Sequence, residues 1–135
     1  MTLPDHDVAF AAVFNLAEGE SAPLVDDGIR LAPVDPRHRR KVSADQLAAL
    51  VPALTGSHPP TRAIDYFRPT AGIWLEKEGK VVGFLEFSLE SASYRSDWTG
   101  IAPALDWPAV VKWLKQLGLN PQWDEKAYKK LLQSN

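Results

Sequence analysis

The chain has no cysteine, and this absence excludes disulfide bonds and thiolate metal sites. No run approaches the roughly 20 apolar residues needed to cross a bilayer. The apolar stretch nearest the start follows the acidic segment Asp5-His6-Asp7 instead of a basic one, which is not the pattern of a signal peptide. We therefore expect a cytoplasmic protein whose fold rests on its apolar core.

The chain also has no strong excess of charge, since its formal net charge at pH 7 is −2. A near-neutral domain lacks the basic footprint that gathers nucleic acid or anionic lipid. The exception is the local run Arg37-His38-Arg39-Arg40-Lys41. We interpret this run as a solvated connection leading into a helix, and the alternative is contact with phosphates or with an acidic partner.

The 135 residues are the length of one ordinary domain, and the 45% of apolar residues is typical of a globular protein. The alternation and capping patterns predict a single α+β domain, residues 1–135, built on an antiparallel sheet of about five strands. We expect strands at residues 8–16, 28–34, 62–68, 72–77 and 80–89, and helices at residues 43–54, 106–118 and 121–133.

The clearest local pattern is a hairpin around Glu78-Gly79. A two-residue loop would pair Lys77 with Lys80, whereas a three-residue loop, Lys77-Glu78-Gly79, pairs Glu76 with Lys80. We favour the three-residue loop because it opposes a carboxylate to an ammonium group and puts Gly79 where a left-handed residue is needed.

The three-residue loop sorts the side chains of the hairpin onto two faces. The apolar face then consists of Ile73, Leu75, Val81, Leu85, Phe87 and Leu89. The opposite face carries Trp74, Val82 and Phe84 near the turn, followed by Glu86, Ser88 and Glu90. We expect this far end of the second face to be exposed to water.

No constellation of catalytic residues stands out. Metal sites need several converging ligands, but His6, His38 and His58 are scattered over expected loops. The chain has neither a Gly-x-Ser-x-Gly elbow nor a glycine-rich loop that would cradle phosphate. These absences favour a binding protein without cofactor or metal over an enzyme.

The expected loop after the hairpin is rich in the residue types that dominate protein interfaces, among them Tyr94, Arg95 and Trp98. We expect Tyr94 and Trp98 to anchor a partner, and Arg95 and Asp97 to orient it. The residues predicted to bind this partner are Glu86, Glu90, Tyr94, Arg95, Asp97 and Trp98. The alternative is that Trp98 folds back over the end of the sheet while Arg95 pairs with Asp97 or Glu90.

Three stretches of the chain share a pattern with other proteins: Ser57-His58-Pro59-Pro60-Thr61-Arg62-Ala63, the turn Glu78-Gly79-Lys80, and Leu85-Glu86-Phe87-Ser88-Leu89-Glu90-Ser91. They resemble a group of uncharacterised small bacterial proteins with the pattern Cys-x-x-Pro-Arg-His-Ala, an Asp-Gly-Lys-type turn and Leu-x-Ile-Cys-Phe-x-Cys. Ser57, Ser88 and Ser91 stand at the three cysteine positions. Because a serine hydroxyl stays protonated near neutral pH, we expect no thiolate chemistry, and we expect Ser57 to lie near Ser88 and Ser91.

Small bacterial α+β proteins of this kind resemble immunity partners of secreted toxins. The leading hypothesis is therefore a protein-binding module, an immunity protein that neutralises a bacterial toxin by occluding its active site. In it, Glu86 and Glu90 meet basic groups of the toxin. The alternative is a small enzyme or ligand-binding domain with Glu86, Glu90, Arg62 and His58 around a carboxylate-lined pocket at the end of the sheet. A third possibility is nucleic-acid binding through residues 37–41.

Overall fold

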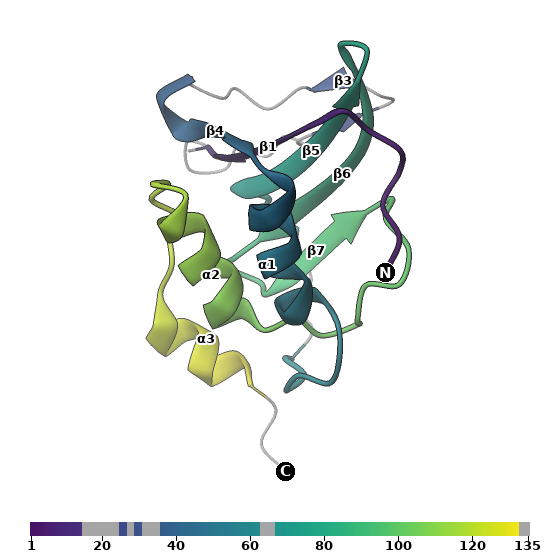
Figure 1. Cartoon of the computed structure of the whole chain (residues 1–135). Coiled ribbons are helices and arrows are strands. Elements are labelled where there is room, and N and C mark those ends of the chain that lie inside the picture. The colour runs from purple at the N-terminus through teal and green to yellow at the C-terminus, as the bar shows by residue number, and fades with distance from the viewer. Residues whose placement is uncertain (15–24, 27–28, 31–35, 63–66, 133–135) are drawn as a thin grey trace.

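The computed structural model describes residues 1–14, 25–26, 29–30, 36–62 and 67–132. It is an α+β domain built on one five-stranded antiparallel sheet, as the sequence predicts, and the strand order is β4-β1-β5-β6-β7 (Figure 1). The strands of this sheet are β1 (Val8–Val13), β4 (Arg39–Val42), β5 (Ala71–Lys77), β6 (Lys80–Ser88) and β7 (Ser93–Ser96). The helices α1 (Ala44–Leu54) and α2 (Trp107–Gln116) lie on one face of the sheet, and α3 (Glu125–Leu131) lies beside α2.

Two of the five predicted strands are not members of this sheet. Within 28–34 the described pair β3 (Ile29–Arg30) forms a separate ladder with β2 (Val25–Asp26), and the other residues of that range lie outside the description. Within 62–68, Arg62, Phe67 and Arg68 are not in a strand, and residues 63–66 lie outside the description. Their places in the sheet are taken by the edge strands β4 and β7, both in segments predicted to be loops. Short polar edge strands lack the apolar alternation that reveals a strand.

The basic run is therefore not a plain solvated connection, because it forms a short 3₁₀ helix, η1 (Pro36–His38), and the edge strand β4. Arg40 donates hydrogen bonds to the carbonyl of Arg37 at 2.8 Å and to that of Gly118, just beyond α2, at 3.3 Å. The guanidinium carbon of Arg39 lies 5.6 Å from the ring centroid of Phe10. Both arginines thus hold the fold together, and a row of cations at a sheet edge discourages pairing with further strands.

The hairpin of β5 and β6 is confirmed, but its predicted three-residue loop is wrong. Lys77 pairs with Lys80 across a two-residue loop, and Glu78 and Gly79 have φ angles of 52° and 78°. Positive φ at both positions is the signature of the type I′ turn, which matches the twist of paired strands. The carboxylate of Asp7 accepts a hydrogen bond from the Glu78 amide at 3.0 Å, and Asp5 forms an ion pair with Lys77. These contacts come from a distant part of the chain, so the hairpin residues alone do not reveal them.

A β-bulge restores most of the predicted faces. Glu76 pairs with Val81 but Leu75 pairs with Gly83, so Val82 is the extra residue of the bulged strand. The faces of the two valines are consequently exchanged relative to the prediction: Val81 packs beside Trp74, and Val82 packs against the core under the helices. The other members of the predicted apolar face are buried: Ile73, Leu75, Leu85, Phe87 and Leu89.

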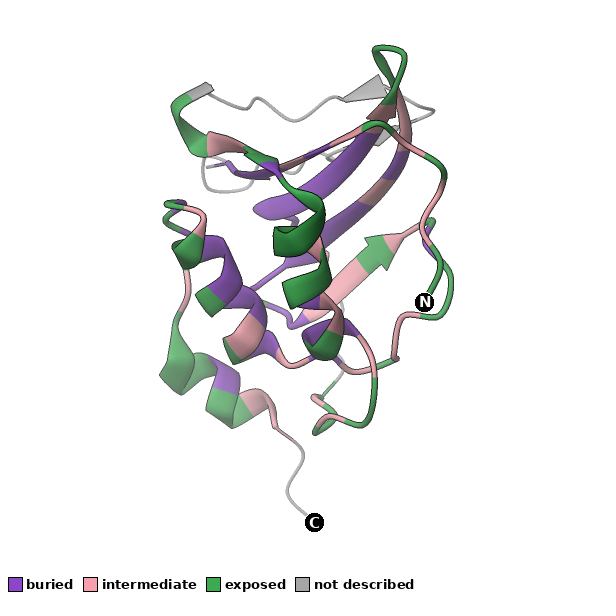
Figure 2. Ribbon diagram, viewed as in Figure 1, coloured by how far each residue is buried: buried purple, intermediate pink, exposed green. Residues whose placement is uncertain are grey.

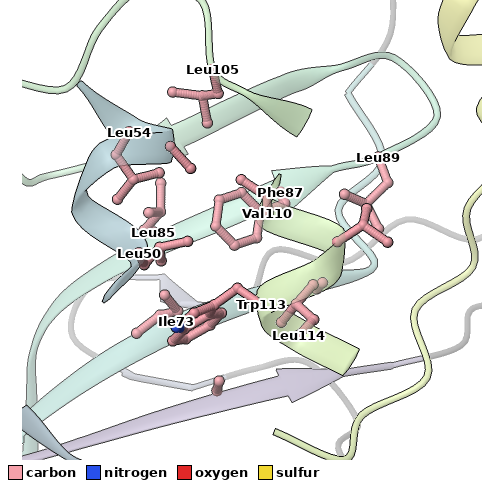
Figure 3. Packing of buried hydrophobic residues seen from close by; sticks show 14 of the residues in the cluster. Leu50, Leu54, Ile73, Leu85, Phe87, Leu89, Leu105, Val110, Trp113 and Leu114 are labelled. Atoms are coloured by element: carbon pink, nitrogen blue, oxygen red, sulfur yellow. The ribbon is translucent and has the colours of Figure 1, made fainter. Parts of the chain in front are cut away.

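The main core lies between the sheet and the helices (Figure 3). Leu50 and Leu54 of α1 and Val110, Trp113 and Leu114 of α2 belong to the same cluster as Ile73, Leu85 and Phe87 of the sheet. Figure 2 shows most of β5 and β6 buried, while α1 turns exposed residues outward. The Trp113 indole donates a hydrogen bond to the Gln46 carbonyl at 2.7 Å, which ties α2 to the first turn of α1.

The helix ends follow their capping residues. The predicted capping box of α1 is confirmed, since the Gln46 amide donates to the Ser43 hydroxyl and the Ser43 amide to the Gln46 side chain. Asp106 caps α2 as predicted. The helix predicted at 121–133 instead begins at Glu125, because Asp124 is its N-cap and accepts a hydrogen bond from the Ala127 amide at 3.1 Å. No helix in the described ranges is both long and apolar enough to cross a membrane.

The type I′ turn yields a stability prediction. Glu78 is exposed and has a left-handed backbone, which favours asparagine over glutamate. We expect Glu78→Asn to raise the free energy of unfolding by about 0.5–1 kcal/mol, and Gly79→Ala to lower it by about 1 kcal/mol. Urea denaturation of both variants measures these changes, and stabilisation by Gly79→Ala would contradict the turn assignment.

Candidate functional site

Part of the second face of the sheet, away from the helices, is buried, so the expectation that its far end is exposed to water is wrong for Glu86 and Ser88 but holds for Glu90. Glu86 and Ser88 are both 0% exposed. Toward the hairpin turn, Trp74 stacks on Phe10 with ring centroids 5.3 Å apart and is 1% exposed. The inner strand β6 is therefore covered on both faces over residues 85–88, and its polar side chains there must find partners inside the protein.

Glu86 finds such a partner in Arg95. The two residues are paired across β6 and β7, and the Arg95 Nε atom lies 2.5 Å from a carboxylate oxygen of Glu86. The Arg95 side chain is 48% exposed, and its guanidinium carbon lies 5.1 Å from the ring centroid of Phe84. Glu86 is thus enclosed by the fold, and Arg95 forms an ion pair with it.

The other residues predicted to contact a partner differ in burial and also make contacts within the protein. Trp98 is 6% exposed and belongs to the main core, which agrees with the alternative that it folds back over the sheet. The half-buried Tyr94 donates a hydrogen bond to the Ala102 carbonyl at 2.8 Å. Asp97 is exposed and accepts a hydrogen bond from the Phe84 amide at 2.9 Å. The predicted surface is therefore broken, and only Glu90, Arg95 and Asp97 are exposed among its six residues.

Two of the three serines at cysteine positions lie together. The hydroxyl oxygens of Ser88 and Ser91 are 2.6 Å apart, and those of Ser91 and Ser93 are also 2.6 Å apart. The Arg68 amide donates to the Ser88 hydroxyl at 3.1 Å. Ser57 is exposed in the segment after α1 and has no hydrogen bond to Ser88 or Ser91 within the described structure. The serine chain fixes the tight turn from β6 to β7, which projects Glu90 outward.

Beside this turn is a cavity of about 420 Å³, called here the sheet-end pocket. It is lined by Leu89, Glu90, Gln122, Trp123, Asp124, Ala127 and Tyr128. Leu89 and Tyr128 are buried, and the rings of Trp123 and Tyr128 are in contact, with centroids 5.1 Å apart. A ligand-binding alternative predicts a pocket at this end of the sheet, and Glu90 is the only one of its predicted residues that lines the pocket.

The pocket combines apolar walls with negative charge. Glu90 and Asp124 supply carboxylates from the β6–β7 turn and from the N-cap of α3, and no lysine, arginine or histidine is among the described residues that line it. The Glu90 side chain is 51% exposed, and one of its oxygens lies 3.6 Å from a guanidinium nitrogen of Arg68. Burial raises the pKa of Tyr128, with a further contribution from the negative charge of Asp106. Aromatic surface and carboxylates together suit a cationic group with an apolar stem.

Sequence reasoning missed Trp123, Asp124 and Tyr128 as site residues because it placed them in a longer helix. A helix beginning at residue 121 puts Trp123 on an inward stripe, whereas Trp123 actually precedes α3 and is half buried. The signal that reveals this is Asp124, which is a good N-cap residue directly after the tryptophan. Across the described ranges, no three histidine, aspartate or glutamate side chains gather in a group able to hold a metal ion.

The ion pair of Glu86 and Arg95 predicts that substitutions of its two members lower the free energy of unfolding by different amounts. Arg95→Met leaves the buried Glu86 carboxylate without this cation, and we expect it to lower the free energy of unfolding by about 3 kcal/mol. Glu86→Gln leaves the Arg95 guanidinium without its carboxylate, but water can reach this group. We therefore expect Glu86→Gln to lower the free energy of unfolding by only about 1 kcal/mol. Urea unfolding of both variants and of the double variant measures the difference. Equal losses in the two single variants would refute the assigned burial.

A pH prediction follows from the half-buried Tyr94 and the buried Tyr128. Burial raises the pKa of both Tyr94 and Tyr128 above the usual value of about 10, so the folded state holds their protons more tightly than the unfolded chain does. The stabilisation they provide is complete below pH 10 and is lost as the pH rises through the raised values. Urea unfolding between pH 8 and 11 should show a smaller alkaline decline for Tyr128→Phe than for the wild type. A decline of the same slope in both proteins would speak against the burial of this phenol.

Comparison with known proteins identifies no relative of this chain. No protein-family model matches the chain, and no curated protein and no solved structure shows significant similarity to it. The function must therefore be argued from the site itself.

Proposed function

We propose that the chain is a protein-binding module whose partner presents a basic group to the sheet-end pocket. In its most specific form, the proposal is an immunity protein that neutralises a bacterial toxin by occluding its active site. The observation that carries it is the pocket itself, where Trp123 and Tyr128 lie beside the carboxylates of Glu90 and Asp124. Aromatic side chains around a charged contact are characteristic of the centres of protein interfaces.

The use of the other polar groups supports binding over catalysis. Glu86 is held by Arg95, and Ser88 accepts a hydrogen bond from the Arg68 amide and contacts Ser91. A catalytic acid or nucleophile has to reach a substrate, and neither of these buried groups lines the sheet-end pocket. Glu90 keeps the role that the sequence suggests for it, which is to meet a basic group of the partner.

A second candidate function is the binding of a small ligand, and the size of the cavity favours it. A volume of about 420 Å³ falls within the range of about 300–1,000 Å³ that is typical of small-molecule sites. Nucleic-acid binding through the basic run loses support, because Arg39 lies against Phe10 and Arg40 contacts the chain beyond α2.

The proposal is tested by screening the products of neighbouring genes for binding and measuring the affinity of any that bind. We expect Trp123→Ala to weaken the complex at least tenfold, as a truncated interface anchor does, and Trp123→Phe to weaken it less. Lys112→Ala, at an exposed position of α2 outside the pocket, is the matched control and should leave the affinity unchanged.

Two results would contradict the proposal. The first is that none of the neighbouring products binds the protein. The second is that a bound product loses no affinity in the Trp123→Ala variant while circular dichroism shows this variant to be folded. For the immunity form of the proposal, co-expression of the wild type must also rescue cells from a toxic product, and Trp123→Ala must rescue them less well.

A further inference from the structure

We infer that the sheet-end pocket binds an arginine side chain, that is, a planar guanidinium group on an aliphatic stem. This inference deepens the proposed function and rests on it in one respect, which is that the arginine belongs to a protein partner. The pocket offers three features for such a group: apolar walls, a half-exposed indole and two carboxylates from different elements.

Different lining residues of the sheet-end pocket suit the methylene stem and the guanidinium group of an arginine side chain. Leu89 and Ala127 provide apolar surface for methylene groups, and Trp123 presents the aromatic surface on which a guanidinium stacks. A guanidinium is more weakly hydrated than an ammonium group, and its flat fork of donors can address two carboxylates at once. Arginine therefore fits this site better than lysine.

The charge of the pocket has one sign among the described lining residues. Glu90 and Asp124 are both anions, and the contact of Glu90 with Arg68 at 3.6 Å leaves the Glu90 side chain 51% exposed. A second cavity, of about 340 Å³ near the start of α1, provides a contrast because Asp7 shares it with Lys41 and His6. Only the sheet-end pocket of these two cavities thus selects for positive charge.

The Asp124 carboxylate and the backbone of Glu90 are held in place before any ligand arrives. Asp124 is fixed because it caps α3 through the Ala127 amide. Glu90 lies in the turn that the hydrogen bond between Ser88 and Ser91 closes. Preorganised groups lose little conformational entropy on binding, which favours recognition of a single side chain.

The direct test is an NMR titration of the full chain with Nα-acetyl-arginine methylamide, following the Trp123 indole and the Glu90 and Tyr128 amides. The matched neutral probe is the citrulline analogue, which has the same shape without the charge, and the lysine analogue separates guanidinium from ammonium. We expect shifts confined to the pocket, with a dissociation constant on the order of 1 mM for arginine. Binding of the lysine analogue should be weaker, and that of citrulline weaker still.

Variants that change one charge each identify the carboxylates. Glu90→Gln and Asp124→Asn should each weaken the arginine probe about two- to fivefold, and asparagine keeps the helix cap intact. Glu125→Gln removes the same charge from the next residue of α3, outside the pocket, and should leave the binding unchanged. An equal effect of Glu125→Gln, equal binding of citrulline and arginine, or tighter binding of lysine would overturn the inference.

The outcomes also separate this inference from the proposed function. If Trp123→Ala abolishes binding of a protein partner but the arginine probe causes no shifts in the pocket, the inference is wrong and the proposed function stands. If the probe binds in the pocket as expected but no protein partner depends on Trp123, the pocket recognises a small guanidinium compound. In that case the proposed function fails, the chemistry assigned to the pocket is supported, and the assignment of the arginine to a protein partner is overturned.

Discussion

The burial of residues 85–88 of β6 on both faces of the strand is the constraint on which the rest of the structure depends. One face carries Leu85 and Phe87 under the helices, while the other carries Glu86 and Ser88, which are equally buried. Buried polar groups require partners, because desolvation is otherwise uncompensated. The ion pair of Glu86 with Arg95 meets this requirement and makes the edge strand β7 part of the sheet's polar interior.

The same requirement shapes the candidate site. Ser88 is buried, and its hydrogen bond with Ser91 closes the chain into a tight turn at the end of β6. That turn places Leu89 in the wall of the sheet-end pocket and Glu90 at its negatively charged part. The N-cap of α3 adds the carboxylate of Asp124 to the lining. The pocket thus lies between the turn closed by Ser88 and Ser91 and the N-terminal cap of α3, and these two features form without a ligand.

Sequence reasoning predicted the elements whose signals are local and failed where tertiary contacts decide. The capping box of Ser43 and Gln46 and the alternation along β5 and β6 are local patterns, and both predictions are confirmed. The length of the hairpin loop could not be predicted, because the amide of Glu78 binds a carboxylate 71 residues away in sequence. The burial of Glu86 could not be predicted either, because an acidic residue in an alternating strand normally indicates an exposed face. In the site, Glu90 was predicted, whereas Trp123 was obscured by a helix assigned four residues too early.

The burial of the second face is tested most directly by thiol labelling, because the cysteine-free chain allows one unique thiol at a chosen position. Ser88→Cys places this thiol on the buried face, and Ser57→Cys places it at an exposed position as the control. Under native conditions, the thiol at position 57 should react with a maleimide as fast as a free thiol does. The thiol at position 88 should react at least about a hundredfold more slowly, since it is reached only through opening of the fold. Equal rates at the two positions, in variants that circular dichroism shows to be folded, would contradict the account.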